Sequence, residues 1–260
     1  MTAGILVAEE RALLRRVFAT IAAVEPGARV ILFGSRARGD AEPDSDWDLL
    51  ILVDGAVDKR RREALSSALL ELQLETGTCI GSIVSGKGEW DRPRLRVSPL
   101  HANIEIDGIE LASDGSGVHV APAEPLPEAV MAEAEENLID EWLERARSAL
   151  AEAEMLARNG LRNGSVSRLY YACFDTVRAL LLHEGYRFSK HSSVQSLFNL
   201  HFVKTGIVPS EFGKLYNTLF EQRGKADYEA FIRFEESQVR DWMEESSRLV
   251  EFISRMLKPA

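Results

Sequence analysis

The chain reads GSRARGDAEPDSDWD from Gly34 to Asp48, and this polar stretch lies between two short apolar runs at residues 29–33 and 48–53. Continuous apolar runs of this length are typical of strands that are covered on both faces. Residues two apart on a strand point to the same face, so Asp46 and Asp48 are expected to present their carboxylates together. Such a pair suits Mg²⁺ or Mn²⁺, which take their remaining ligands from water and phosphate. The stretch therefore predicts metal-dependent phosphate chemistry beside a sheet.

The beginning of the same stretch is suited to binding phosphate. Gly34 lets the backbone approach a ligand closely, and the N–H group and hydroxyl of Ser35 can donate to phosphate oxygens. Arg36 and Arg38 are placed to neutralise more of the charge. Each half of the stretch alone is more often an ordinary turn or solvated surface. Their combination, with ten residues between Ser35 and Asp46, predicts a site for ATP or another NTP at Gly34, Ser35, Arg36 and Arg38.

The neighbouring sequence predicts an α/β (α+β) domain with a small mixed sheet over residues 1–112. An amphipathic helix covers residues 13–21, another covers 59–74, and a third strand covers 78–84. Residues 113–128 contain three prolines and two glycines without apolar periodicity. This composition marks a linker or an extended crossing segment.

Only the helical period of 3.6 residues is found after that segment. Asn159–Gly160 is a favoured helix end, and Ser165 is the expected N-cap of the helix that follows. Apolar stripes indicate helices at residues 138–153, 165–181, 191–204, 209–222 and 239–253. We predict an all-α, antiparallel helical bundle over residues 129–260.

Composition narrows the class of protein and its partners. The 260 residues are enough for two domains, and 31 Lys and Arg against 41 Asp and Glu leave a net charge of −10, so strong duplex DNA binding is not expected. No run approaches the roughly 20 apolar residues of a membrane span, and no secretory signal is recognisable. We expect a cytoplasmic protein without a membrane partner. Cys79 and Cys173 are far apart and each lies inside an apolar stretch, so they form no thiolate metal site and are expected to be buried free thiols.

The spacing of Gly34-Ser35 and Asp46-x-Asp48 resembles that of the minimal nucleotidyltransferases of the DNA polymerase β superfamily. The resemblance covers about residues 10–112 and includes a segment at 99–105 like the one that closes many of these domains. It implies transfer of a nucleoside monophosphate from an NTP to a hydroxyl. Gly34 and Ser35 would hold the triphosphate, and Asp46 and Asp48 would be the catalytic, metal-binding carboxylates.

One departure from that family concerns a third carboxylate. Catalytically complete members have it on the next strand, where it helps to activate the attacking hydroxyl. Residues 77–84 read GTCIGSIV and contain no acid. Glu75, Glu105 and Asp107 are the alternatives that the sequence leaves open. The departure also keeps open a catalytically impaired module that binds nucleotide or neutralises a toxin.

The second half resembles the HEPN domains (higher eukaryotes and prokaryotes nucleotide-binding), which are helical bundles often fused to, or encoded with, a minimal nucleotidyltransferase. The matching pieces are SRLYYA at residues 167–172, HFVKTG at 201–206 and RGKADY at 223–228. The resemblance implies a toxin–antitoxin-like fusion with a protein or RNA acceptor. A homo-oligomer is left open.

The motif residues of this half are Arg223, Asp227 and Tyr228. Ribonuclease members of the family place a histidine shortly after the arginine, but here Tyr228 stands five positions after Arg223 and no histidine follows His201. A phenol with a pKa of about 10 is a poor general base, so a HEPN ribonuclease is the weaker alternative. A tyrosine beside this motif accepts adenylyl groups in related systems, which makes Tyr228 a candidate acceptor. The competing interpretation is that Tyr228 packs against Arg223.

Overall fold

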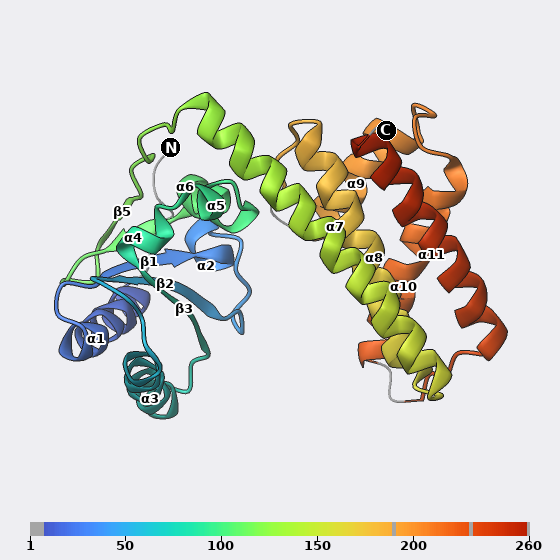
Figure 1. Ribbon diagram of the computed structural model, residues 1–260. Helices are drawn as coiled ribbons and strands as arrows, with labels where there is room; N and C mark the ends of the chain where they lie inside the picture. The colour runs from blue at the N-terminus through green and yellow to red at the C-terminus, as the bar shows by residue number, and fades with distance from the viewer. Residues whose placement is uncertain (1–7, 189–190, 229–230, 259–260) are drawn as a thin grey trace. The chain divides into compact units, whose positions relative to one another are not determined.

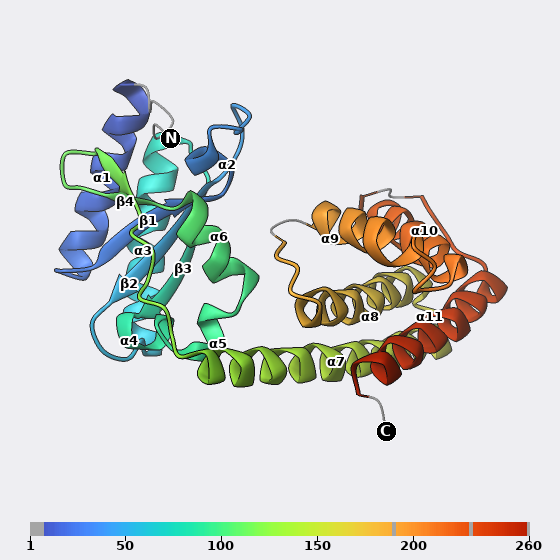
Figure 2. The ribbon, with the colours of Figure 1, turned by 90° about the horizontal axis from the view of Figure 1, so that it is seen from above.

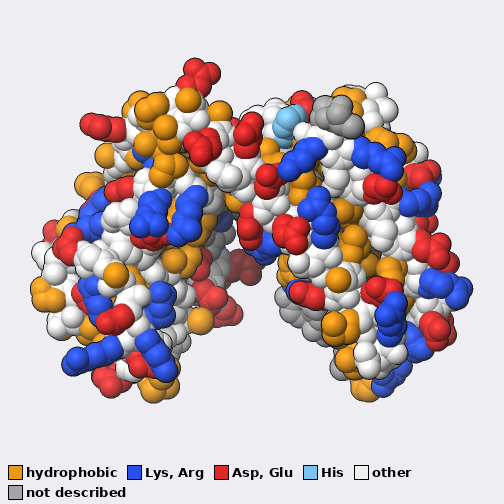
Figure 3. Space-filling view, viewed as in Figure 1, with side chains coloured by type: hydrophobic (Ala, Val, Ile, Leu, Met, Phe, Trp, Pro, Cys, Tyr) orange, Lys and Arg blue, Asp and Glu red, His pale blue; other side chains and the backbone are white. Residues whose placement is uncertain are grey.

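The computed structural model describes residues 8–188, 191–228 and 231–258, apart from the side chains of residues 191–192 and 227–228. The chain divides into two compact units, Met1–Glu128 and Ala129–Ala260, which are described separately (Figure 1). Within the described part, no helix combines the length and the apolar composition needed to cross a bilayer. On the face drawn in Figure 3, Lys and Arg side chains are interspersed with Asp and Glu, so this face carries no broad field of one sign.

A five-stranded mixed sheet forms the centre of the first unit, in the order β3-β2-β1-β4-β5. Strands β2 and β3 are parallel, and the other neighbouring pairs are antiparallel. The strands are β1 (Arg29–Phe33), β2 (Trp47–Val53), β3 (Ile80–Gly86), β4 (Ile109–Leu111) and β5 (Gly117–His119). The predicted α/β domain with a small mixed sheet is confirmed.

Helices cover both faces of the sheet (Figure 1). On one face, Leu49 and Ile51 of β2 pack with the apolar side chains of α1 and α3. On the other, Leu50 and Leu52 pack with Trp90 and other side chains of the short helices. Because sides alternate along a strand, Asp48 belongs to the face of Leu50 and Leu52. The helices are α1 (Ala8–Val24), α3 (Lys59–Thr76), α4 (Lys87–Trp90), α5 (Pro93–Arg96) and α6 (Pro99–Asp107).

Two segments of the first unit differ from the expectation. The polar stretch begins with a short helix, α2 (Gly34–Arg38), rather than a loop. Ala37 is the one residue that α2 buries, so the sequence contains no apolar periodicity that would predict this helix. The segment 113–128 contributes β5 to the sheet edge beside β4. Strand β5 is mostly exposed, which explains why its sequence lacks the apolar pattern of a strand.

The second unit is all-helical, as predicted (Figure 2). Its helices are α7 (Glu128–Arg158), α8 (Arg162–His183), α9 (His191–Phe198), α10 (Ser210–Tyr228) and α11 (Glu236–Leu257), with a π-helical turn η1 at Asn199–Val203. Helix α8 is the most buried of these and packs against α10 and α11. Its residues Leu169, Cys173 and Val177 are completely buried. The apolar stripe that predicted this helix is therefore a core stripe. Cys173 is thus a buried thiol as expected, whereas Cys79 of the first unit is exposed and that expectation was wrong.

Two local expectations about the helices were wrong. Ser165 is not an N-cap but lies inside α8, where its hydroxyl donates to the carbonyl of Ala153 at 2.9 Å and ties α8 to α7. The motif at 223–228 does not follow the fourth helix but forms its last turns, because α10 continues to Tyr228. Gly224 thus lies inside α10, where a Cβ on it would meet nothing within 4 Å, and Ala226 after it packs against the core.

Candidate functional site

Asp48 occupies the centre of the candidate site in the first unit. It lies opposite Phe33 of β1 and opposite Gly81 of β3. Partial burial and the nearby Asp46 carboxylate raise the pKa of Asp48 above that of an ordinary aspartate. The two carboxylates are therefore close enough to repel each other, and a bound divalent cation would relieve that repulsion.

Glycines leave the space that the Asp48 carboxylate fills. Gly34 has a φ of 76°, and a Cβ on it would overlap Oδ2 of Asp48. A Cβ on Gly81 would lie 3.2 Å from Oδ1 of Asp48. Both oxygens of the Asp48 carboxylate thus lie beside glycines that carry no side chain, and carboxylate oxygens are ligands that suit a small hard cation such as Mg²⁺. The described residues contain no group of three His, Cys, Asp or Glu side chains able to hold a metal.

The residues predicted to bind phosphate belong to α2, whose first residue, Gly34, lies against Asp48. Gly34 and Ser35 form the first turn of α2, where backbone N–H groups have no partner within the helix. Arg38 forms ion pairs with Asp40 at 3.2 Å and with Asp107 of α6 at 3.6 Å. Its charge also acts on Asp48 and favours the ionised carboxylate. The structure therefore brings Arg38 together with both Asp48 and Asp107.

Arg36 has a different environment. Its guanidinium donates to the carbonyl of Pro43 at 2.7 Å and to that of Ser45 at 2.9 Å. It also lies over the Trp47 ring, 4.6 Å from the centroid, and its side chain is only 14% exposed. These contacts hold the loop that carries Asp46 against β2, a role that sequence reasoning missed because the partners are backbone carbonyls.

The second unit brings one motif residue into a defined contact. Arg223 of α10 donates through Nη2 to the hydroxyl of Tyr171 on α8, at 3.2 Å. The side chains of Asp227 and Tyr228 lie outside the described residues, so both interpretations of Tyr228, as an acceptor and as a residue packed against Arg223, stay predictions. The contact joins two of the three pieces that carry the HEPN resemblance.

Comparison with known families assigns both units. Residues 14–99 match the family model described as "Nucleotidyltransferase domain", and residues 139–256 match the one described as "HEPN domain". The chain belongs to the nucleotidyltransferase–HEPN fusions. Over 123 residues the fusion is 43% identical to a "UPF0332 protein" of Thermotoga maritima, covering 47% of this chain and 93% of the relative. Over 120 residues it is 32% identical to a "Putative toxin" of Methanocaldococcus jannaschii, covering 46% of this chain and 89% of the relative. A second "Putative toxin" of that organism is 32% identical over 100 residues, which cover 38% of this chain and 68% of that relative.

Three residues of the fusion, Glu75, Glu105 and Asp107, were the alternatives for the third carboxylate, and their surroundings differ. Glu75 pairs with Arg16 on the outer surface of α1 and α3. Glu105 accepts a hydrogen bond from the backbone N–H of Ala123 at 3.2 Å and lines a cavity of about 320 Å³ with the buried His101. Asp107 alone among these three is joined, through Arg38, to the surroundings of Asp48.

For Asp107 as the general base of a nucleotidyl transfer at the candidate site, we expect Asp107→Asn to lower the rate by about 100-fold, since a positioned general base contributes about 10²- to 10⁴-fold. ATP affinity should change little, because a base acts mainly in the chemical step. Glu105→Gln is the matched control on the same helix and should keep the normal rate. The measurement is the turnover number of each variant beside its ATP-dependent thermal shift. Equal turnover in the two variants would remove Asp107 from the reaction.

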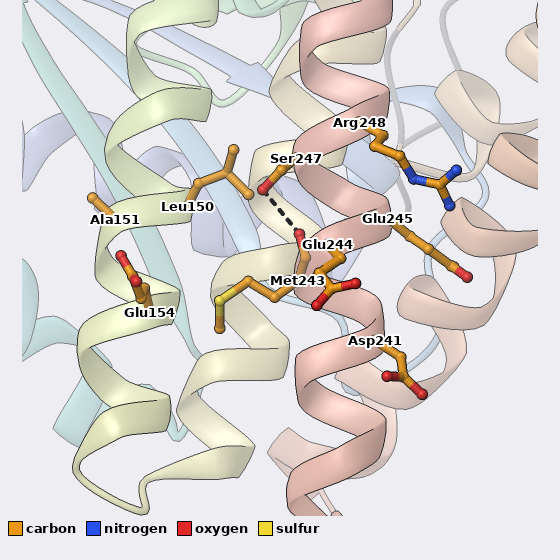
Figure 4. A pocket seen from close by; sticks show the side chains of 9 residues that line it. All are labelled: Leu150, Ala151, Glu154, Asp241, Met243, Glu244, Glu245, Ser247 and Arg248. Carbon is orange, nitrogen blue, oxygen red and sulfur yellow. Dashed lines mark hydrogen bonds between the residues drawn. The ribbon is translucent and has the colours of Figure 1, made fainter.

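A large open cavity in the helical unit of the fusion is a poorer place for a nucleotide. It has a volume of about 870 Å³ and lies between α7 and α11 (Figure 4). Its carboxylates belong to Glu154, Asp241, Glu244 and Glu245, against the single cation Arg248. An excess of negative charge disfavours phosphate.

Proposed function

We propose that the chain transfers a nucleoside monophosphate, AMP in the first instance, from an NTP to a hydroxyl acceptor in a Mg²⁺-dependent reaction. The observation that carries this proposal is the pair of carboxylates Asp46 and Asp48. The Asp48 carboxylate lies against Gly34, the first residue of α2, and against Gly81 of β3. Nucleotidyltransferase domains use an NTP and a divalent metal. The carboxylate pair and the adjoining first turn of α2 are the groups that such a reaction requires.

In this proposal the residues of the site have separate roles. The first turn of α2 at Gly34 and Ser35, with the guanidinium of Arg38, binds and orients the triphosphate. Asp46 and Asp48 would hold the divalent cation, which would neutralise charge on the transferred phosphoryl group. Asp107 accepts the proton of the attacking hydroxyl, and its ion pair with Arg38 keeps it beside the phosphate site.

The acceptor is proposed to be a protein hydroxyl in a toxin–antitoxin-like fusion. Two relatives of the chain carry the word toxin in their names, and a HEPN domain follows the nucleotidyltransferase domain in one polypeptide. A tyrosine of the HEPN half is thus an acceptor that every copy of the chain supplies. Tyr228 is the candidate that the motif suggests.

A second candidate function is a module that binds nucleotide or neutralises a toxin without chemistry. The observation that favours it is the sequence of β3, which lies beside Asp48 and carries no carboxylate from Ile80 to Gly86. In such a module the carboxylate pair would hold metal and nucleotide without turnover.

Incubation of the chain with labelled ATP and Mg²⁺ tests the proposal against this rival. We expect pyrophosphate release together with a mass increase of one AMP on the chain or on an added acceptor protein. Intact-mass measurement and a pyrophosphate assay read the two products independently. A protein that binds ATP but forms neither product is the nucleotide-binding module and not a transferase.

A further inference from the structure

His101 of α6 is buried without a hydrogen-bond partner. The residue is 2% exposed, and neither of its ring nitrogens has a partner among the described residues. Its ring stacks on the indole of Trp90, with 4.8 Å between the ring centroids. Buried polar atoms of proteins nearly always have a partner, so an unpaired imidazole marks a place where a ligand can bind.

The imidazole borders a cavity of the first unit, which we call the His101 cavity. It has a volume of about 320 Å³, and Leu52, Trp90 and Glu105 are among the other residues that line it. Sites for small molecules begin at about 300 Å³. The His101 cavity is therefore large enough for a small ligand.

The His101 cavity lies away from the candidate site around Asp48. Leu52 pairs with Arg29 at one end of the β1–β2 ladder, whereas Asp48 pairs with Phe33 at the other end. Four residues along a strand correspond to about 13 Å. The two places thus share one face of the sheet but are separate.

The charged groups of the His101 cavity favour a cation. Those that line it are Arg29, Arg96, Asp91, Glu105 and Glu124. The guanidinium of Arg29 is already bound to Glu110 by two hydrogen bonds of 2.9 Å, and that of Arg96 donates to the carbonyl of Glu124 at 2.6 Å. The carboxylates outnumber the guanidinium groups even without Glu110, and an excess of negative charge attracts a positively charged ligand.

Glu105 is the carboxylate nearest to the unpaired imidazole. One of its oxygens accepts a hydrogen bond from the backbone N–H of Ala123 at 3.2 Å, and the other lies 3.8 Å from Nδ1 of His101. In the described part of the chain, no Lys or Arg forms an ion pair with Glu105. Burial lowers the pKa of His101, so its ring is neutral at neutral pH and one nitrogen can accept a hydrogen bond. A carboxylate and a neutral imidazole together offer acceptors to an ammonium group.

We propose that the His101 cavity binds a small organic amine. The ammonium group donates to Glu105 and to a ring nitrogen of His101, and the apolar body of the ligand packs against Leu52 and Trp90. Binding there does not depend on nucleotidyl transfer, because Asp46 and Asp48 are not among the residues that line the cavity.

Three probes of nearly one size and different charge test this site on the full chain: phenethylamine, phenylethanol and phenylacetate. Of the four tryptophans, only Trp90 lines the His101 cavity, so its indole N–H signal in a proton–nitrogen correlation spectrum reports binding there. The loss of one signal in Trp90→Phe assigns it. We expect phenethylamine to shift this signal at millimolar concentration, phenylethanol to bind about tenfold more weakly, and phenylacetate to leave the signal in place.

Two substitutions test the acceptors. Glu105→Gln keeps the shape of the side chain but removes its charge, and should weaken phenethylamine binding by about tenfold, the factor for a hydrogen bond between charged groups. His101→Phe keeps a ring beside Trp90 without the nitrogens and should weaken it as well. Glu124→Gln is the matched control, because it makes the same change in net charge on an exposed residue and should change the affinity little. Melting temperatures without probe establish that each variant is folded.

The remaining outcomes contradict the assignment. Phenethylamine that leaves the Trp90 signal in place, or shifts only the signals of other tryptophans, overturns the binding site. Equal affinity for the amine and the alcohol, or tighter binding of phenylacetate, overturns the choice of a cation. An unchanged affinity for phenethylamine in folded Glu105→Gln and His101→Phe variants overturns the roles given to the two acceptors.

Discussion

The double substitution Asp46→Asn with Asp48→Asn is expected to abolish both the Mg²⁺-dependent stabilisation of the protein by ATP and AMP transfer. The amides keep the shape of the side chains but remove the charges that hold the cation. Nucleotide at about 100 times its Kd stabilises a protein by about 2.7 kcal/mol, and the variant should lose this gain. Melting temperatures with and without ATP and Mg²⁺ measure it.

The unliganded double variant should melt no lower than the natural protein. Burial and repulsion by Asp46 raise the pKa of Asp48 in the folded state, so the ionised carboxylate opposes folding at neutral pH, where the unfolded chain carries it freely. Removing that charge removes the penalty. A normal melting temperature without ligand thus separates loss of the site from loss of the fold.

The matched control removes two charges from the same loop. Glu42 and Asp44 are exposed and lie within the polar stretch, so Glu42→Gln with Asp44→Asn makes the same change in net charge. This variant should keep the full stabilisation by ATP. If Mg²⁺ and ATP stabilise the Asp46 and Asp48 double variant as strongly as this control, the candidate site is not the metal site.

Substitution of Gly34 by alanine is expected to lower AMP transfer by about 100-fold, which is the scale of loss for a catalytic group displaced by about 1 Å. The new Cβ would overlap the Asp48 carboxylate, and the backbone at φ 76° is one that L-residues rarely adopt. The overlap pushes Asp48 away from its place beside Asp46, whereas the strain falls on the backbone at residue 34. Turnover at saturating ATP and Mg²⁺ measures the loss.

Gly39→Ala separates the two effects. Gly39 has nearly the same backbone conformation, with φ 78°, but a Cβ on it meets nothing within 4 Å. This variant should show backbone strain of about 1 to 2 kcal/mol and retain most of its activity. Similar turnover in Gly34→Ala and Gly39→Ala would mean that the space beside Asp48 has no part in the reaction.

Much of the fold of the first unit, and the position of its candidate site, could be predicted from local sequence. Asp46 and Asp48 were expected to share a face because residues two apart on a strand do so; β2 begins only at Trp47, but the charge of Asp46 does act on Asp48. The apolar run that follows them predicted a covered strand. Gly34 was assigned to close backbone approach because glycine alone has no Cβ. The helical half was predicted from its 3.6-residue period. These features depend on residues that are neighbours along the chain, so the amino-acid sequence by itself determined them.

The tertiary structure decided which distant residues meet around the candidate site and between the helices of the second unit. Glu105 and Asp107 are two positions apart, yet Glu105 binds the backbone of Ala123 and Asp107 pairs with Arg38. Arg223 meets Tyr171 across 52 positions. Such contacts follow from strand register and from the packing of one helix on another, because these bring together side chains that no spacing in the sequence relates.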